Sequence, residues 1–198
     1  MLIRGLRVWV VATLFASAAV VQGRAAASRL EIVVSVFNRA GVEQTSILDA
    51  EETAGKIYRE ARIVIHWRNC RTQTEPELEH CEQTVDRRQL VLNIEHQLQN
   101  LTTDAYGVAF LGDDGWGTFC DVSYHQILEL HHVGRASEAT ILGIVAAHEL
   151  GHLLLGLDAH SATGIMRPQL RYQDFLTSEF ATGFTRSQVQ KICDRFRK

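Results

Sequence analysis

Three residues in the last third of the chain have the types and spacing to hold a metal ion. His148, Glu149 and His152 form the pattern His-Glu-x-x-His. Residues four apart on a helix lie on the same face, with about 5–6 Å between Cβ atoms, so two imidazoles can reach one ion. Glu149 then lies beside the ion, where its carboxylate can accept a proton from a water molecule bound there.

A zinc site that keeps a water molecule needs a third protein ligand, and Asp158 and His160 are the two candidates that follow the motif. The motif is short enough to occur by chance, so its surroundings matter. The apolar run 141–147 predicts a helix that is buried on every side. Ser137 is a suitable N-cap for this helix, and Gly156 a suitable end.

The stretch 147–166, AHELGHLLLGLDAHSATGIM, resembles the metzincin clan of zinc metallopeptidases. In that clan His-Glu-x-x-His is followed by a glycine turn, a third His or Asp ligand and a methionine turn under the metal. His160 and Ser161 resemble the ligand and serine of the matrixin-like members. Gly164-Ile165-Met166 resembles the methionine turn.

The spacing of the third ligand differs from the metzincin pattern. Glycine and the ligand usually stand seven and ten positions after the first histidine, where this chain has Leu155 and Asp158. Glycine comes one position later, and His160 two positions later. Either a longer turn makes His160 the ligand, or Asp158 binds as in the aspartate variants. The serine and the methionine turn that follow favour His160.

The resemblance implies a zinc-dependent metalloendopeptidase that acts on peptide or protein substrates. Zn2+ would be held by His148, His152 and the third ligand, with Glu149 as general base. Met166 would form a hydrophobic floor and bind no metal. The tyrosine that some metzincins place two residues after this methionine is absent, because Pro168 stands there.

Three other readings remain open. A gluzincin would take its third ligand from a later helix, with Glu179 as the candidate. A non-catalytic zinc-binding module could share the fold, but an intact Glu149 argues against it because structural zinc is usually closed by four protein ligands. A chance motif without metal is the third.

The pattern of apolar residues predicts an α+β fold. The predicted elements are a strand at 30–37, a helix at 46–62, strands at 63–67 and 90–94, and a C-terminal helix at 185–196. Strand, helix and strand at this spacing imply a right-handed crossover and a partly parallel sheet. This order fits the zincin-like plan of a mixed, twisted sheet with an antiparallel edge strand, a central active-site helix and a closing helix.

The segment before the active-site helix is predicted to form two strands. By resemblance, Val108, Ala109, Phe110 and Leu111 form the edge strand that binds substrate; the backbone groups of an unpaired edge can pair with an extended peptide. The alternating stretch 118–130 predicts a returning strand. His131 and His132 follow it as neighbours on opposite faces, and are interpreted as exposed rather than as ligands.

Residues 1–27 are predicted to be a signal peptide. Arg4 and Arg7 precede an apolar run at 8–21, and Ala25-Ala26-Ala27 provides a small-x-small cleavage site. The run is short for a bilayer span, although an uncleaved anchor is the alternative. Residues 28–198 then form one catalytic domain, secreted to an extracellular or periplasmic space. Its 17 basic and 23 acidic residues indicate neither nucleic-acid nor membrane binding, and we expect a monomer.

Four cysteines in an exported chain predict disulfides. Cys70 and Cys81 flank a polar loop and are expected to bridge it, which leaves Cys120 to pair with Cys193. A zinc role is not expected, because the chain has no Cys-x-x-Cys.

Overall fold

A computed structural model describes residues 29–70, 81, 86–99, 105–170, 175 and 183–197. The predicted signal segment lies outside this part of the chain. The elements are β1 (Leu30–Asn38), α1 (Gln44–Glu60), β2 (Ile63–Cys70), β3 (Gln89–Glu95), β4 (Gly107–Phe110), β5 (Phe119–Ser123), α3 (Tyr124–Val133), α4 (Glu138–Leu155) and α5 (Arg186–Phe196).

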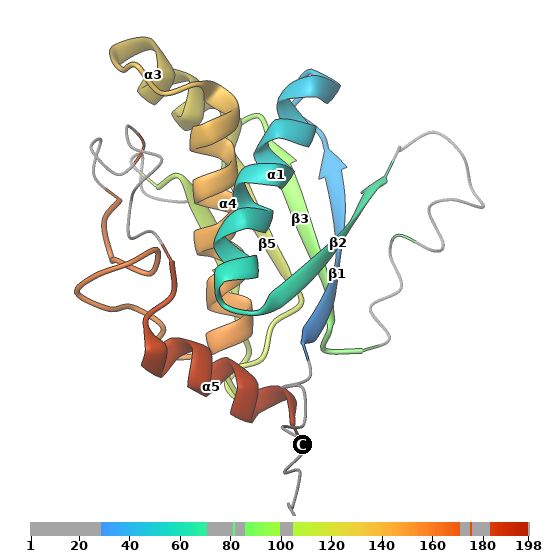
Figure 1. Cartoon of the computed structure of the whole chain (residues 1–198). Helices are drawn as coiled ribbons and strands as arrows, with labels where there is room; N and C mark the ends of the chain where they lie inside the picture. The colour runs from blue at the N-terminus through green and yellow to red at the C-terminus, as the bar shows by residue number, and fades with distance from the viewer. Residues whose placement is uncertain are drawn as a thin grey trace, which may run out of the picture.

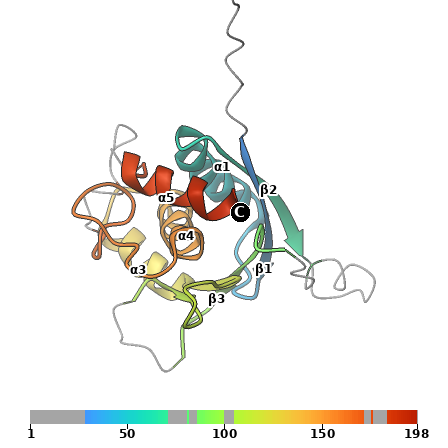
Figure 2. The ribbon, with the colours of Figure 1, turned by 90° about the horizontal axis from the view of Figure 1, so that it is seen from below.

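The five strands form one mixed sheet in the order β2-β1-β3-β5-β4. The first four strands in this order run parallel, and β4 pairs antiparallel with β5 at the edge. Helices α1 and α4 pack against each other on one face, and α5 crosses the C-terminal end of α4 (Figures 1 and 2). The predicted α+β class, the partly parallel sheet and the antiparallel edge strand are confirmed.

Helix α4 is the centre of the hydrophobic core. Its composition would suit a membrane span, but 83% of that stretch is buried inside the protein, so it is a core helix. The sheet presents Ile32, Val34 and Val36 of β1 to the core, each at most 2% exposed. Tyr58 of α1 donates its hydroxyl hydrogen to the carbonyl oxygen of Ala147 at 2.8 Å, which ties the two helices together.

The prediction of one strand over 118–130 is wrong in its second half. The strand ends at Ser123, whose hydroxyl accepts a hydrogen bond from the backbone N–H of Gln126 and caps α3. Ile127 and Leu130, three residues apart, are buried on one face of this helix. His131 and His132 therefore lie in the last turn of a helix rather than on a strand.

One of the two predicted disulfides is present. Cys70 and Cys81 are bridged, with Cα atoms 6.1 Å apart. The predicted Cys120–Cys193 bridge is wrong, because both residues are free thiols. Cys120 lies opposite Leu92 within the sheet, and its sulfur is 3.7 Å from the carbonyl oxygen of Val91, which directs the thiol toward β3.

Candidate active site

The ends of α4 set the position of the two motif histidines. Ser137 accepts a hydrogen bond from the backbone N–H of Thr140 at 3.1 Å and caps the first turn, as predicted. The helix ends at Gly156, whose φ of 76° is strained for other residues and whose N–H donates to the carbonyl oxygen of His152. The chain therefore leaves the helix one turn after His152 and can return toward it.

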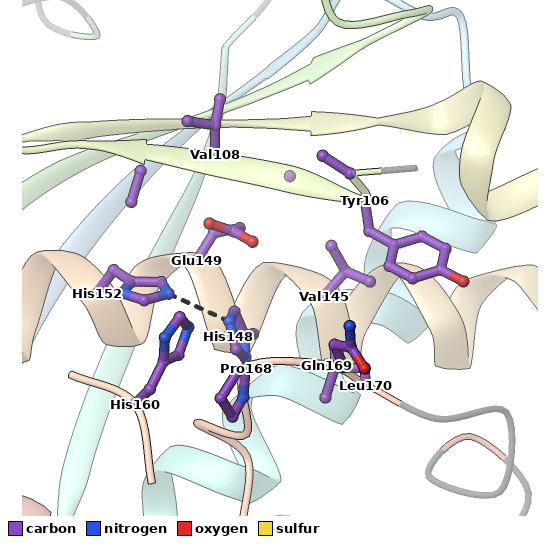
Figure 3. A pocket seen from close by; sticks show the side chains of 13 residues that line it. Tyr106, Val108, Val145, His148, Glu149, His152, His160, Pro168, Gln169 and Leu170 are labelled. Carbon is purple, nitrogen blue, oxygen red and sulfur yellow. Dashed lines mark hydrogen bonds between the residues drawn. The ribbon is translucent and has the colours of Figure 1, made fainter. Parts of the chain in front are cut away.

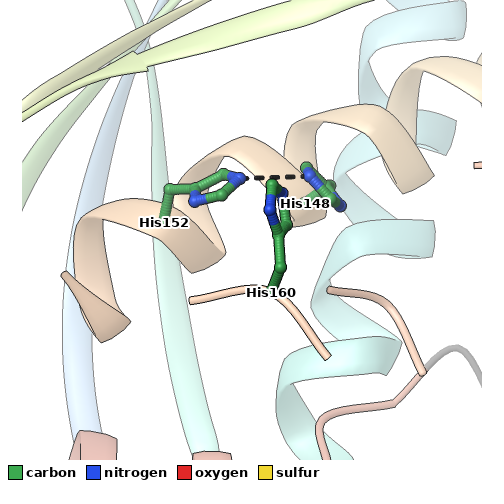
Figure 4. A group of neighbouring side chains, drawn as sticks. All are labelled: His148, His152 and His160. Carbon is green, nitrogen blue, oxygen red and sulfur yellow. Dashed lines mark hydrogen bonds between the residues drawn. The ribbon is translucent and has the colours of Figure 1, made fainter. Parts of the chain in front are cut away.

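The structure brings His160, rather than Asp158, to the two helix histidines. One nitrogen from each of His148, His152 and His160 lies within 4.8 Å of the others (Figure 4). The ring centroids are 4.7 to 5.6 Å apart. Asp158 is exposed, has a positive φ of 55°, and is not part of this group. The longer turn is thus the geometry adopted, although metal binding by His160 stays a prediction.

The hydrogen bonding of His148 fixes which of its nitrogens can bind a metal. Its Nδ1 lies 2.7 Å from the carbonyl oxygen of Ile165. A carbonyl oxygen only accepts, so Nδ1 carries the hydrogen and Nε2 keeps its lone pair. That Nε2 is 3.2 Å from Nε2 of His152. Partners of this kind commonly orient ligating histidines.

Burial favours the neutral, metal-binding form of the two histidines on α4. It lowers the pKa of His148. It also lowers the pKa of His152 to about 4, with a smaller contribution in the same direction from His148 and His160. Three imidazoles are a ligand set that Zn2+ accepts while keeping one position open for water. The donor set therefore fits the predicted ion.

Glu149 lies beside the three imidazoles without joining them. Its side chain is buried, and burial raises the pKa of its carboxyl group to about 8. Within the described residues, neither a hydrogen bond nor an ion pair reaches this carboxylate. Figure 3 shows it between α4 and the overlying edge strand. The neighbour there is Gly107, which the sequence analysis missed because no local pattern relates the two positions.

The predicted methionine turn lies beneath α4. Met166 is fully buried, and its sulfur occupies the space that a side chain at position 151 would need. Gly151 is therefore required for this packing. Gly164 has a φ of 79°, which lets the chain turn tightly before Ile165. Ile165 in turn presents its carbonyl oxygen to His148, so the turn also orients a predicted ligand.

A cavity of about 580 Å³ opens over the histidines. It is lined by Ala105, Tyr106, Gly107, Val108, Ala109, Val145, His148, Glu149, His152, His160, Pro168, Gln169 and Leu170 (Figure 3). Of the four predicted substrate-binding residues, Val108 and Ala109 line it. Phe110 and Leu111 do not, and Phe110 instead stacks on Phe119 with ring centroids 4.5 Å apart.

Sequence reasoning gave no role to Tyr106 or Val145, and it pointed to 168–170 only as part of the loop after Met166. Tyr106 precedes the edge strand, Val145 lies one turn before His148, and 168–170 follow the methionine turn. Only the position of 168–170 after Met166 offered a signal. The gluzincin candidate Glu179 lies outside the described residues.

Comparison with known proteins supports the fold. No family model matches the sequence, and no curated protein is significantly similar to it. Among solved structures, archaemetzincin from Methanopyrus kandleri is 16% identical, with a TM-score of 0.54 over 87% of this chain and 98% of that one. The chain therefore has a fold similar to that of this archaemetzincin. A zinc-dependent peptidase from Methanocorpusculum labreanum (strain Z) is 12% identical, with a TM-score of 0.54 over 80% of this chain and 99% of that one. At these identities the likeness concerns the fold, and it does not test the matrixin-like assignment.

Proposed function

We propose that this protein is a zinc-dependent metalloendopeptidase. The observation that supports this most is the convergence of His148, His152 and His160 next to a buried Glu149 in an open cavity. The fold shared with the two peptidases agrees with it. A purely structural zinc site is usually closed by a fourth protein ligand. Within the described residues the metal-binding group has three members.

The residues of the chain then have distinct roles. Zn2+ at the three imidazoles would lower the pKa of its water to about 7 and polarise the scissile carbonyl. Glu149 accepts a proton from the attacking water and passes it to the leaving amine. A group that does both works best with a pKa near the working pH, and burial moves the pKa of Glu149 in that direction. His148 is held in the required tautomer by Ile165.

The edge strand β4 would bind the substrate backbone. It pairs with β5 on one side, and its other side is an edge of the sheet. Val108 and Ala109 of this strand border the cavity. An extended peptide can add to such an edge by main-chain hydrogen bonds. We therefore propose peptides or unfolded protein segments as substrates.

We further propose that the protein is exported and acts as a monomer. The predicted signal segment at 1–27 motivates the export. The Cys70–Cys81 disulfide is consistent with an oxidising compartment. N-terminal sequencing of the protein recovered outside the cytoplasm should begin near Ser28, and an intact Met1 would contradict cleavage.

The deciding experiment is the substitution Glu149→Gln. It removes the base but preserves the size of the side chain, so we expect peptide cleavage to fall about 10²–10⁴-fold. Zinc content should stay near that of the wild type, because Glu149 is not among the metal-binding group. Glu51→Gln is the matched control, since Glu51 is also a buried glutamate but lies in α1. Unchanged turnover in Glu149→Gln would show that this residue is not the general base. A wild-type protein that binds zinc but cleaves no peptide would favour the alternative of a non-catalytic zinc-binding module.

A further inference from the structure

Of the three histidines, His160 is the one that no regular secondary structure holds in place. His148 and His152 project from α4, whereas His160 lies on the segment 156–161, which is neither helix nor strand. This segment contains two residues with positive φ, Gly156 and Asp158. Within the described residues, no hydrogen bond reaches the His160 ring. Its position therefore depends on what holds the surrounding backbone.

Gln188 of α5 binds the residues on both sides of His160, one through its backbone and the other through its side chain. Its Nε2 donates one hydrogen bond to the carbonyl oxygen of Ala159 at 3.0 Å and another to the hydroxyl of Ser161 at 2.9 Å. The two partners directly precede and follow His160 in the chain. Both hydrogens of one amide group thus fix the residues that flank the imidazole.

Two more side chains of α5 contact the same segment. Lys191 donates to the carbonyl oxygen of Leu157 at 2.8 Å. Arg195 donates to the carbonyl oxygen of Gly115 at 2.9 Å, and its guanidinium lies against Gly156. Gln188, Lys191 and Arg195 are three and four residues apart, so they share one face of the helix. These contacts pair the start of α5 with Ala159 and its end with Gly156, so the helix and the segment run antiparallel. Helix α5 itself crosses the C-terminal end of α4 (Figure 2).

Among these contacts, those of Gln188 matter most for His160. Gln188 is only 7% exposed, whereas Lys191 is exposed and its bond competes with water. The orientation of the amide is also determined. The backbone N–H of Thr185 can only donate to Oε1, and the carbonyl of Ala159 can only accept from Nε2. A flipped amide would lose both bonds.

We propose that Gln188 is a positioning residue for His160 and thereby sets the zinc affinity of the three-histidine site. This inference rests on the proposed function to the extent that His160 is a zinc ligand. Gln188 does not touch the ion or the substrate. It acts by holding Ala159 and Ser161, so that the imidazole is already near its partners before the ion binds.

The test uses a variant that keeps α5 intact but removes the donated hydrogens. In Gln188→Glu, a carboxylate oxygen can still accept from Thr185, and Glu is a normal residue at this position of a capping box. We expect zinc affinity, measured by competition with a chromophoric chelator, to fall about 10–100-fold. In a His160→Ala background the same substitution should cause no further loss, since coupled residues are not additive.

Thr185→Ala is the matched control. It removes the hydroxyl that accepts from the Gln188 backbone N–H and weakens the helix cap, but it leaves both donations to the segment. We expect a lower melting temperature with unchanged zinc affinity. An equal loss of affinity in Thr185→Ala and Gln188→Glu would overturn the inference, because general weakening of α5 would then explain both. Unchanged affinity in Gln188→Glu would also overturn it.

Amide hydrogen exchange of the zinc-free protein provides a second readout. Residues 157–161 should exchange faster in Gln188→Glu than in the wild type, and at the wild-type rate in Thr185→Ala. A wild type that binds zinc but cleaves no peptide would overturn the proposed peptidase and leave this inference standing. A wild type that binds no zinc would overturn the proposed function together with the effect on affinity, while the exchange rates would still decide whether Gln188 holds the segment.

Discussion

Gly107 of β4 lies directly against the side chain of Glu149 in α4. A methyl group on residue 107 would be 2.5 Å from Cγ and 2.8 Å from Cδ of Glu149. These distances are too short for any real contact, so only glycine allows the edge strand to approach the helix this closely. The edge strand therefore confines the proposed base on the side away from the core.

The first prediction follows from this contact. In Gly107→Ala the methyl group must displace the Glu149 side chain, so we expect turnover on a fluorogenic peptide to fall at least about tenfold, a part of the usual contribution of a general base. Zinc content should not change, because the three atoms nearest to the added methyl group all belong to Glu149 and none to an imidazole. Gly55→Ala is the control, since a methyl there meets only the flexible end of Arg59 closely. Wild-type turnover in Gly107→Ala would show that the carboxylate can act from another position.

The second prediction concerns the third ligand. His160→Ala should weaken zinc binding strongly, because it removes one of the three converging imidazoles. Asp158→Asn should weaken it little: it removes the carboxylate, and asparagine tolerates the positive φ of this position. Zinc affinities of the two variants are the measurement. Loss of zinc in Asp158→Asn with retention in His160→Ala would assign the site to the aspartate type.

The third prediction concerns the packing beneath the metal site. Gly151→Ala places a methyl group where the sulfur of Met166 lies, so we expect the free energy of unfolding to fall by about 1–3 kcal/mol. Denaturant unfolding measures this. Adding Met166→Ala should lower the free energy of unfolding less in the Gly151→Ala background than in the wild type. In that background the methionine side chain already clashes with the new methyl group, so less favourable packing is lost when it is removed. Strictly additive losses would contradict the contact.

The fourth prediction concerns the thiols. A thiol reagent should label Cys193, which is partly exposed, in the native protein and should reach Cys120 only after unfolding, because Cys120 is completely buried. Reduction of Cys70–Cys81 should lower the free energy of unfolding by about 2–3 kcal/mol, the range for a loop of this length. If the denatured but unreduced protein has no free thiol, this prediction is wrong and Cys120 and Cys193 are bridged.

The sequence alone determined the features that depend on near neighbours. His148 and His152 are one helical turn apart in any helix, and Ser137 and Gly156 mark the ends of that helix through their own backbone preferences. The apolar run before the motif indicated a buried helix, and the β-branched run at 30–37 a buried strand. The same kind of signal misled at 118–130, because alternation does not reveal that the hydroxyl of Ser123 caps a new helix.

Tertiary structure decided the relationships between residues that are distant in sequence. Asp158 and His160 were both within reach of the motif histidines, and the path of the chain after Gly156, held by α5, brings His160 to them. Cys120 faces β3 rather than α5, so an even number of cysteines did not imply two bridges. Gly107 and Glu149 meet only because β4 lies at the edge of the sheet over α4. Such contacts depend on how whole elements pack, and no periodicity or cap within one segment reports them.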